Sequence, residues 1–165
     1  GLEIFVSILL GTILLFSVYR ILEKYIRKKH EIETNNVAYS IYCSSVLLSV
    51  GYLVAGIHTP ILNTIRLLNS STNSSITDTL LQTFLYSSIY LFVLIIIIAI
   101  VIISATMLFN YMTKNISEFK EIKKNNIATG IILGVIVLCI AIIVKDSIYL
   151  VIESFVPYPE IKNFI

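Results

Sequence analysis

Charged side chains are scarce in this sequence. They make up 13% of its 165 residues, about half of the roughly 25% that is typical of soluble domains. Hydrophobic residues reach 57%, above the roughly 45–50% of soluble proteins. The net charge is only +2, which gives no reason to expect a nucleic-acid partner. The composition therefore predicts a membrane protein.

Residues that carry chemistry are also few. The two cysteines, Cys43 and Cys139, both fall inside apolar runs, so they do not suggest a disulfide framework. His30 and His58 are expected on opposite sides of the membrane and cannot share a metal. No ionisable residue lies near the centre of an apolar run, where ion-coupled transporters usually keep one. We therefore expect a protein that is not an enzyme and that has no metal or cofactor.

Four apolar runs are long enough to cross a bilayer as helices. A span needs about 20 mostly apolar residues, and the runs cover residues 4–22, 37–57, 80–112 (with the apolar centre at 90–109) and 127–144. The predicted fold is an all-α polytopic membrane protein with four transmembrane helices. The predicted units are a two-helix segment at 1–57, an outer loop at 58–79, a second two-helix segment at 80–144 and an outer tail at 145–165.

Two shorter apolar patterns lie outside the predicted spans. Residues 60–68 and 148–156 each show a short apolar or amphipathic pattern. We expect both to lie along the membrane surface.

The basic residues are distributed unevenly between the connections. Nine of the twelve fall in the first and third connections. Loops rich in Lys and Arg stay on the cytoplasmic side, so both termini are expected outside the cytoplasm. The basic stretch at 19–31 could also bind anionic lipid, but the two glutamates in it dilute the charge and favour orientation alone.

One phrase occurs twice in the chain. "EIETNNVA" at 31–38 and "EIKKNNIA" at 121–128 are 90 positions apart, and each opens an apolar run. The chain is thus predicted to be two copies of a helix, a basic loop and a helix. The first helices of both copies run the same way, so a pseudo-two-fold axis would lie along the membrane normal.

A doubled two-helix unit with this phrase resembles the domain-of-unknown-function family 350, the YjfL-type bacterial inner-membrane proteins. The resemblance covers residues 4–57 and 88–144. It implies a protein of the bacterial inner membrane and implies no reaction. It also suggests cytoplasmic coiled-coil or flotillin-like membrane-associated proteins of envelope stress as partners.

The repeated phrase has two possible roles. Asparagine is a good N-cap and acids favour helix N-termini, so the phrase could simply cap two helices. Alternatively, the second and fourth helices cross along stripes of small residues, with Asn36 and Asn126 facing each other. The capping and inter-helix residues are Glu31, Asn35, Asn36, Ala38, Glu121, Asn125, Asn126 and Ala128, and the stripes are Ser40 with Ser44 and Gly130 with Gly134.

Two classes of function remain open. The first is an oligomeric membrane scaffold that docks partners on its basic loops for envelope maintenance or stress response. The second is a pore, channel or transporter subunit formed by oligomerisation, with Ser45 and Ser49 as its candidate polar lining. In both we expect a homo-oligomer, with contacts through the first and third helices and the two surface segments, since the repeat presents two similar faces per chain.

Overall fold

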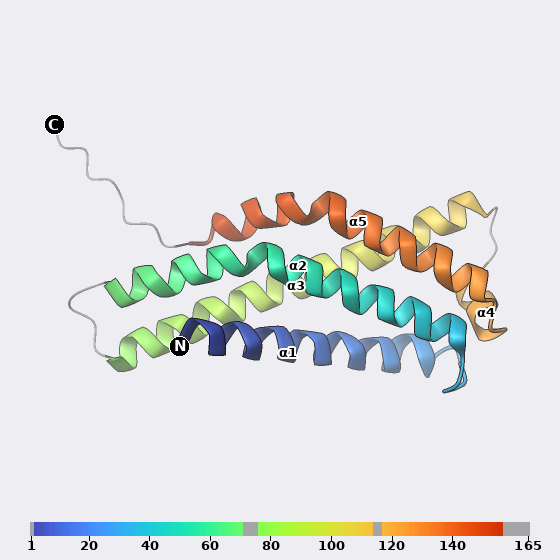
Figure 1. Ribbon diagram of the computed structural model, residues 1–165, viewed down its shortest axis with the longest axis horizontal. Helices are drawn as coiled ribbons and strands as arrows, with labels where there is room; N and C mark the ends of the chain where they lie inside the picture. The colour runs from blue at the N-terminus through green and yellow to red at the C-terminus, as the bar shows by residue number, and fades with distance from the viewer. Residues whose placement is uncertain (1, 71–75, 114–116, 157–165) are drawn as a thin grey trace.

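The computed structural model of the protein describes residues 2–70, 76–113 and 117–156, and the elements within these ranges are all helices. They are α1 (Leu2–Leu22), the π-helix η1 (Glu23–Arg27), α2 (Val37–Ser70), α3 (Ile76–Met112), α4 (Glu118–Lys123) and α5 (Ile127–Glu153). The four long helices lie side by side as an elongated bundle, with α2 between α1 and α5 and with α3 behind (Figure 1).

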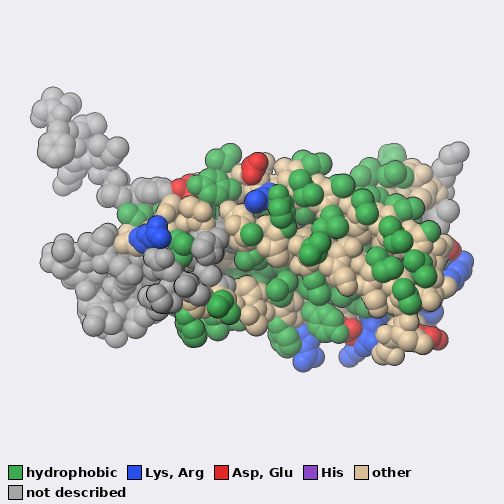
Figure 2. Space-filling view, viewed as in Figure 1, with side chains coloured by type: hydrophobic (Ala, Val, Ile, Leu, Met, Phe, Trp, Pro, Cys, Tyr) green, Lys and Arg blue, Asp and Glu red, His purple; other side chains and the backbone are tan. Residues whose placement is uncertain are grey.

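Three of the helical segments are long and apolar enough to cross a membrane, among the residues that the structure describes. They are Val37–Gly56 within α2, Phe84–Met112 within α3 and Ile127–Glu153, which is α5. Large apolar side chains are exposed over the part of this face that is not drawn in grey, and more of the charged groups on it lie in the half that contains α4 (Figure 2). An exposed apolar surface of this extent is expected where lipid covers the protein.

The core forms where one stripe of each helix faces its neighbours. On α1 the buried residues Leu14, Val18 and Leu22 are four apart, which places them on one helix face. The same kind of stripe recurs on each of the other long helices. It comprises Val46, Val50 and Leu53 on α2, Leu94, Ile98 and Val101 on α3, and Leu133, Val137 and Ala141 on α5.

The predicted outer loop at 58–79 is wrong for most of its length. Helix α2 continues through Pro60 to Ser70, and α3 already begins at Ile76. The 34 residues of α2 span about 51 Å at 1.5 Å per residue, well beyond the roughly 30 Å hydrocarbon core. Thr64 is buried and its hydroxyl lies 2.6 Å from that of Tyr90 on α3. Packing against α3 therefore keeps this segment helical and within the bundle.

The second predicted surface segment is part of the bundle as well. Residues 148–153 continue α5, so the tail predicted from 145 begins as helix. Ile148, Ile152 and Val156 are buried. An apolar stripe has the same spacing whether it meets lipid headgroups or another helix, and here α5 meets the neighbouring helices. The rest of the predicted tail, 157–165, lies outside the described residues.

Candidate functional site

The two copies of the repeated phrase meet at one end of the bundle, where α1 and α3 end and α2 and α5 begin (Figure 1). The first copy, residues 31–38, leads into α2, and the second, residues 121–128, runs from α4 into α5. Hydrogen bonds and an ion pair join them. We call these two segments together the motif junction.

Each copy contains an asparagine that caps the long helix after it. The side-chain oxygen of Asn36 accepts a hydrogen bond from the backbone N–H of Tyr39 at 2.7 Å. That of Asn126 accepts from the N–H of Thr129 at 3.4 Å. The first N–H groups of a helix have no intrahelical partner, and asparagine satisfies one of them. The second asparagine of each copy therefore fixes where an apolar helix begins.

The first asparagine cap also reaches across to the second copy. Nδ2 of Asn36 donates to the backbone carbonyl of Ile122 at 2.6 Å and to that of Lys123 at 3.4 Å. In the other direction, Oδ1 of Asn125 accepts from the backbone N–H of Ala38 at 3.0 Å. Asn36 is only 4% exposed, so the loss of its side chain would leave buried polar groups without partners. Side-chain amides thus join the start of α2 to the end of α4 and to the turn before α5.

The predicted contact between Asn36 and Asn126 is not what the structure shows. Asn36 is buried against the second copy, whereas Asn126 is exposed. The amide nitrogen of Asn126 instead donates to Glu121 in its own segment, at 3.0 Å. Equivalent letters in a repeat do not guarantee equivalent contacts, because the turns that deliver them differ. Among the described contacts, four motif residues have no bond to the other copy: Asn35, Glu121, Asn126 and Ala128. Asn35 and Ala128 are both exposed.

The turns of the two copies place the left-handed residue differently. Among the described residues, positive φ outside glycine occurs at Glu31 (52°) and Asn125 (60°). At each, backbone hydrogen bonds close the preceding helical turn, from Ile32 to Arg27 in the first copy and from Asn126 to Glu121 in the second. This is the Schellman pattern that ends helices. The first copy therefore ends its helix at the glutamate of the motif, and the second ends α4 four residues later in the motif.

Charge pairs connect the exposed rim of the motif junction. Lys123 Nζ lies 3.0 Å from Glu31 Oε2, and Lys124 Nζ lies 2.7 Å from Glu121 Oε1. The hydrogen bond from Lys123 lowers the pKa of Glu31. Hydrogen bonds from Lys124 and then Asn126 lower the pKa of Glu121. The Glu31 side chain is exposed, Glu121 is partly exposed, and both lysines lie at the surface, so these pairs contribute little to stability.

An apolar floor supports the rim. The ring of His30 stacks on Phe119 of α4 with centroids 4.8 Å apart, and Phe119 meets Tyr42 of α2 edge to face at 6.1 Å. Ile32 and Ile122, the second residue of each motif copy, are both buried. Aromatic contacts of this kind add about 0.5–1.5 kcal/mol each beyond area burial. The floor therefore packs α4 and the first connection onto α2.

Two glycines allow α5 to cross α2 closely beside the motif junction. A Cβ on Gly130 would lie 2.5 Å from the backbone oxygen of Ala38, and one on Gly134 would lie 2.5 Å from the hydroxyl of Ser45. Small residues allow such approaches between helices in membranes. Among the pairs of elements, α2 and α5 have the most extensive contact. Gly130 and Gly134 thus lie at the main helix crossing.

The partner stripe predicted on α2 is wrong. Ser40 and Ser44 are exposed on α2, and Ala38 and Ser45 meet the glycines instead. A spacing of four identifies residues on one helix face but does not say which face meets the partner. The rotation of α2 about its axis decides this, and it turns the Ser40–Ser44 face toward α1, where both residues line a pocket with Tyr19.

The two serines predicted to line a pore donate their hydroxyls to backbone carbonyls within α2. The hydroxyl of Ser45 donates to the carbonyl of Ile41 at 2.9 Å, and that of Ser49 donates to the carbonyl of Ser45 at 2.8 Å. Ser49 is only 2% exposed. Such bonds to the preceding turn satisfy a hydroxyl without water. Both hydroxyls therefore have hydrogen-bond partners inside α2.

Sequence reasoning missed α4 and the ion pair that begins η1. Glu23 Oε2 lies 2.6 Å from Arg27 Nη2, and Glu23 also accepts a hydrogen bond from Tyr19 at 3.2 Å. The i, i+4 spacing of Glu23 and Arg27 is a signal that could have found this pair. For α4, the only local signal is the spacing of Phe119 and Ile122, too short a pattern to separate a helix from a loop.

The described residues contain no cluster of three or more His, Cys, Asp or Glu side chains that could hold a metal ion. Within the same ranges Cys43 is buried, Cys139 is exposed and both are free. The motif junction is instead built from amides, backbone groups and surface charges, which are suited to holding helices together.

The fold identifies the class of protein. An all-helical bundle with three helices able to span a membrane and an apolar surface is a multi-pass membrane protein. A family model described as Domain of Unknown Function (DUF350) matches residues 1–148, so the chain belongs to this family. No curated protein and no solved structure matches the chain.

Proposed function

We propose that the protein is a non-enzymatic scaffold of the bacterial inner membrane with four spans, in which α1 is the fourth. Helix α1 has 21 residues, enough to cross the hydrocarbon core. It packs against α2 and ends beside the motif junction. Each half of the chain is then one two-helix repeat, and the motif junction ties the repeats together at the cytoplasmic face.

The main support for this proposal is that polar side chains of the motif bond to other groups of the junction. The amides of Asn36 and Asn125 bond to backbone groups of the opposite copy, and Glu31 and Glu121 bond to lysines. The amides hold the two copies together, and the two carboxylates are paired with lysines at the surface. Around them, Lys28, Lys29 and Lys120 remain exposed at the same end. The junction is thus a rigid, charged platform, suited to docking a cytoplasmic protein of envelope maintenance or stress response.

Assembly into a homo-oligomer is part of the proposal. The second predicted surface segment packs one stripe into the bundle but leaves Leu150, Val151 and Phe155 exposed, so it stays a candidate contact between chains. The exposed faces of α1 and α3 remain, and they carry Phe5, Ile8 and Phe16 on α1 and Phe84, Phe92 and Ile96 on α3. Native mass spectrometry in gentle detergents should show more than one chain per particle, and single chains in all of them would contradict assembly.

Orientation and docking can be tested in the same cells. Single cysteines at Lys29 and Gln82, both exposed positions, should differ in labelling by an impermeant reagent added outside. We expect labelling at 82 and none at 29. A photo-crosslinking residue at 29 should then form a discrete adduct with a cytoplasmic coiled-coil or flotillin-like protein. The same residue at Ile143, which is 76% exposed on α5, should not. Adducts at neither position would contradict docking.

Flux measurements separate the scaffold from a pore. Because Ser45 and Ser49 are packed within the bundle, proteoliposomes should leak ions no faster than empty liposomes. Leakage that bulky residues at these two positions abolish would overturn the scaffold proposal in favour of a pore.

A further inference from the structure

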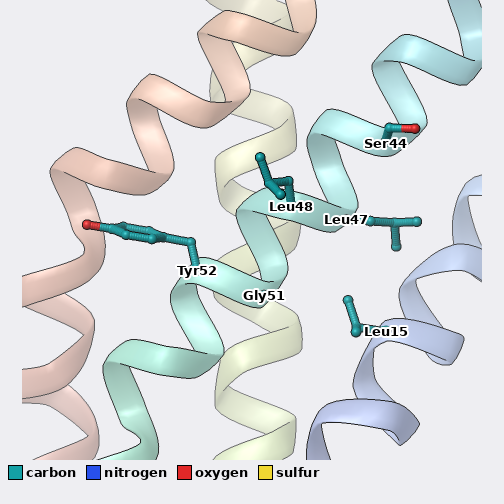
Figure 3. A pocket seen from close by; sticks show the side chains of 6 residues that line it. All are labelled: Leu15, Ser44, Leu47, Leu48, Gly51 and Tyr52. Atoms are coloured by element: carbon teal, nitrogen blue, oxygen red, sulfur yellow. The ribbon is translucent and has the colours of Figure 1, made fainter.

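A groove runs along the surface of the bundle where α1 meets α2. Its apolar part has a volume of about 780 Å³. Leu15 of α1 and Leu47 of α2 extend toward each other across it, and Gly51 leaves the surface of α2 bare between Leu47 and Tyr52 (Figure 3). The full lining of this part is Leu15, Ser44, Leu47, Leu48, Gly51 and Tyr52.

The groove continues into a polar part at the end near the motif junction. The polar part shares Ser44 and Leu47 with the apolar part, so the two are continuous. Tyr39 lines it and is only 5% exposed, and its hydroxyl has no hydrogen-bond partner among the described residues. The Nε of Arg27, which also lines it, is likewise buried and without a partner there. Two donors are therefore left for a ligand.

A basic rim adjoins the polar part. An exposed hollow shares Tyr19, Glu23 and Arg27 with it. Four basic residues and one acid line this hollow, and that acid, Glu23, is already bonded to Arg27 and Tyr19. The rim therefore carries an excess of positive charge, which favours an anionic group. The basic residues are Arg20, Lys24, Arg27 and Lys28.

The length of the groove matches one leaflet of a bilayer. From Ser40 in the polar part to Gly51 in the apolar part is eleven residues along α2, or about 16 Å at 1.5 Å per residue. The hydrocarbon core is roughly 30 Å thick, so half of it is about 15 Å. A basic rim, two unpartnered donors and an apolar channel of this length match the order of parts in a phospholipid.

We propose that this groove binds one anionic phospholipid of the adjacent leaflet. Its phosphate lies at the basic rim within reach of Arg27 and Tyr39, and an acyl chain lies over Gly51 between Leu15 and Leu47. A free phosphate compound would use only the rim, and a second copy of the chain would use only the apolar part. The site does not depend on the proposed scaffold function.

The test compares two glycine variants in purified protein. A Cβ on Gly51 or on Gly11 of α1 would meet no other atom within 4 Å, so Gly51→Leu and Gly11→Leu should both fold. Only Gly51→Leu fills the groove. Native mass spectrometry with added phosphatidylglycerol should show retained lipid in the wild type and in Gly11→Leu, and about tenfold less in Gly51→Leu. Equal retention in the two variants would overturn the groove as the site, and loss of an oligomer instead of lipid would assign it to a second copy.

The charge preference is tested with matched lipids. Phosphatidylglycerol should be retained over phosphatidylcholine with the same acyl chains. Lys24→Gln with Lys28→Gln should reduce that preference by about fivefold for each charge removed. Equal retention of both lipids by the wild type would overturn the anionic headgroup. Glycerol phosphate that competes as well as the lipid at equal concentration would overturn the role of the acyl chain.

Discussion

The two copies of the repeated phrase share five of eight letters but have different structures. In the first copy the left-handed residue is Glu31, and five residues separate it from α2. In the second it is Asn125, and a single residue separates it from α5. As a result, of the four asparagines in the two copies, Asn36 and Asn125 bond across the junction, whereas no such bond is found for Asn35 and Asn126 among the described contacts. Two nearly identical segments that bind each other therefore need not do so symmetrically.

The largest effect should come from the glycine at the helix crossing. In Gly130→Leu the new side chain would meet the backbone of Ala38, which cannot move aside as a flexible side chain could. Overpacking typically costs about 1–3 kcal/mol, and we expect the upper end here. Its repeat mate is Ser40, which is exposed. Thermal unfolding in detergent should show a large loss for Gly130→Leu and almost none for Ser40→Leu, and similar losses would contradict the asymmetric crossing.

Removal of the asparagine cap should also cost more stability in the first copy than in the second. Asn36→Leu leaves the N–H of Tyr39 without its partner, at about 1–3 kcal/mol for a buried group. It also removes one of two hydrogen bonds to the carbonyl of Ile122, which still accepts from the N–H of Asn125. Asn126→Leu removes an exposed cap with a long 3.4 Å bond, and should cost about 1 kcal/mol or less. Unfolding midpoints of the two variants measure the difference. A greater loss for Asn126→Leu would reverse the assignment.

Substitutions at Asn125, in the left-handed turn of the second copy, should cause a smaller loss of stability. Asn125→Ala removes the bond to Ala38 and places alanine at φ 60°, a left-handed conformation that asparagine adopts more readily than alanine. Asn125→Gly should recover the conformational part but not the hydrogen bond. Asn35→Ala, at the matching exposed position of the first copy, should leave the unfolding midpoint unchanged. A loss in Asn35→Ala as large as that in Asn125→Ala would show that the turns are equivalent.

The smallest expected effect is a change in the pH dependence of folding stability. The carboxylate pKa values of Glu31 and Glu121 are lowered in the folded protein, by hydrogen bonds from Lys123 and from Lys124 with Asn126. Their contribution to stability is therefore complete above the ordinary pKa of 4.5 and is lost as pH falls through the lower folded values. Unfolding midpoints of the wild type and of Glu31→Gln should differ slightly at neutral pH and converge in acid. A difference that grows in acid would contradict the Glu31–Lys123 pair.

Much of the fold could be read from the sequence because lipid imposes long apolar runs. The starts of α2 at Val37 and α5 at Ile127 were predicted to the residue, since the asparagine caps mark them. The extension of α2 to Ser70 was not predicted, because Pro60 and polar residues usually indicate a loop, and only packing against α3 keeps that segment helical. For the site, composition and spacing identified the motif residues. Which asparagine crosses to the other copy depends on turn geometry that the shared letters do not encode.

Zero-length cross-linking in native membranes tests most directly whether the two motif copies bind each other. A carbodiimide joins a carboxylate to an amine in direct contact, and Glu31 Oε2 lies 3.0 Å from Lys123 Nζ. Mass spectrometry of the digested protein should identify a Glu31–Lys123 amide within one chain, with the closer Glu121–Lys124 pair as an internal control. Mixed light and heavy chains distinguish links within and between chains. A Glu121–Lys124 link without any Glu31–Lys123 link in the same chain would contradict the motif junction.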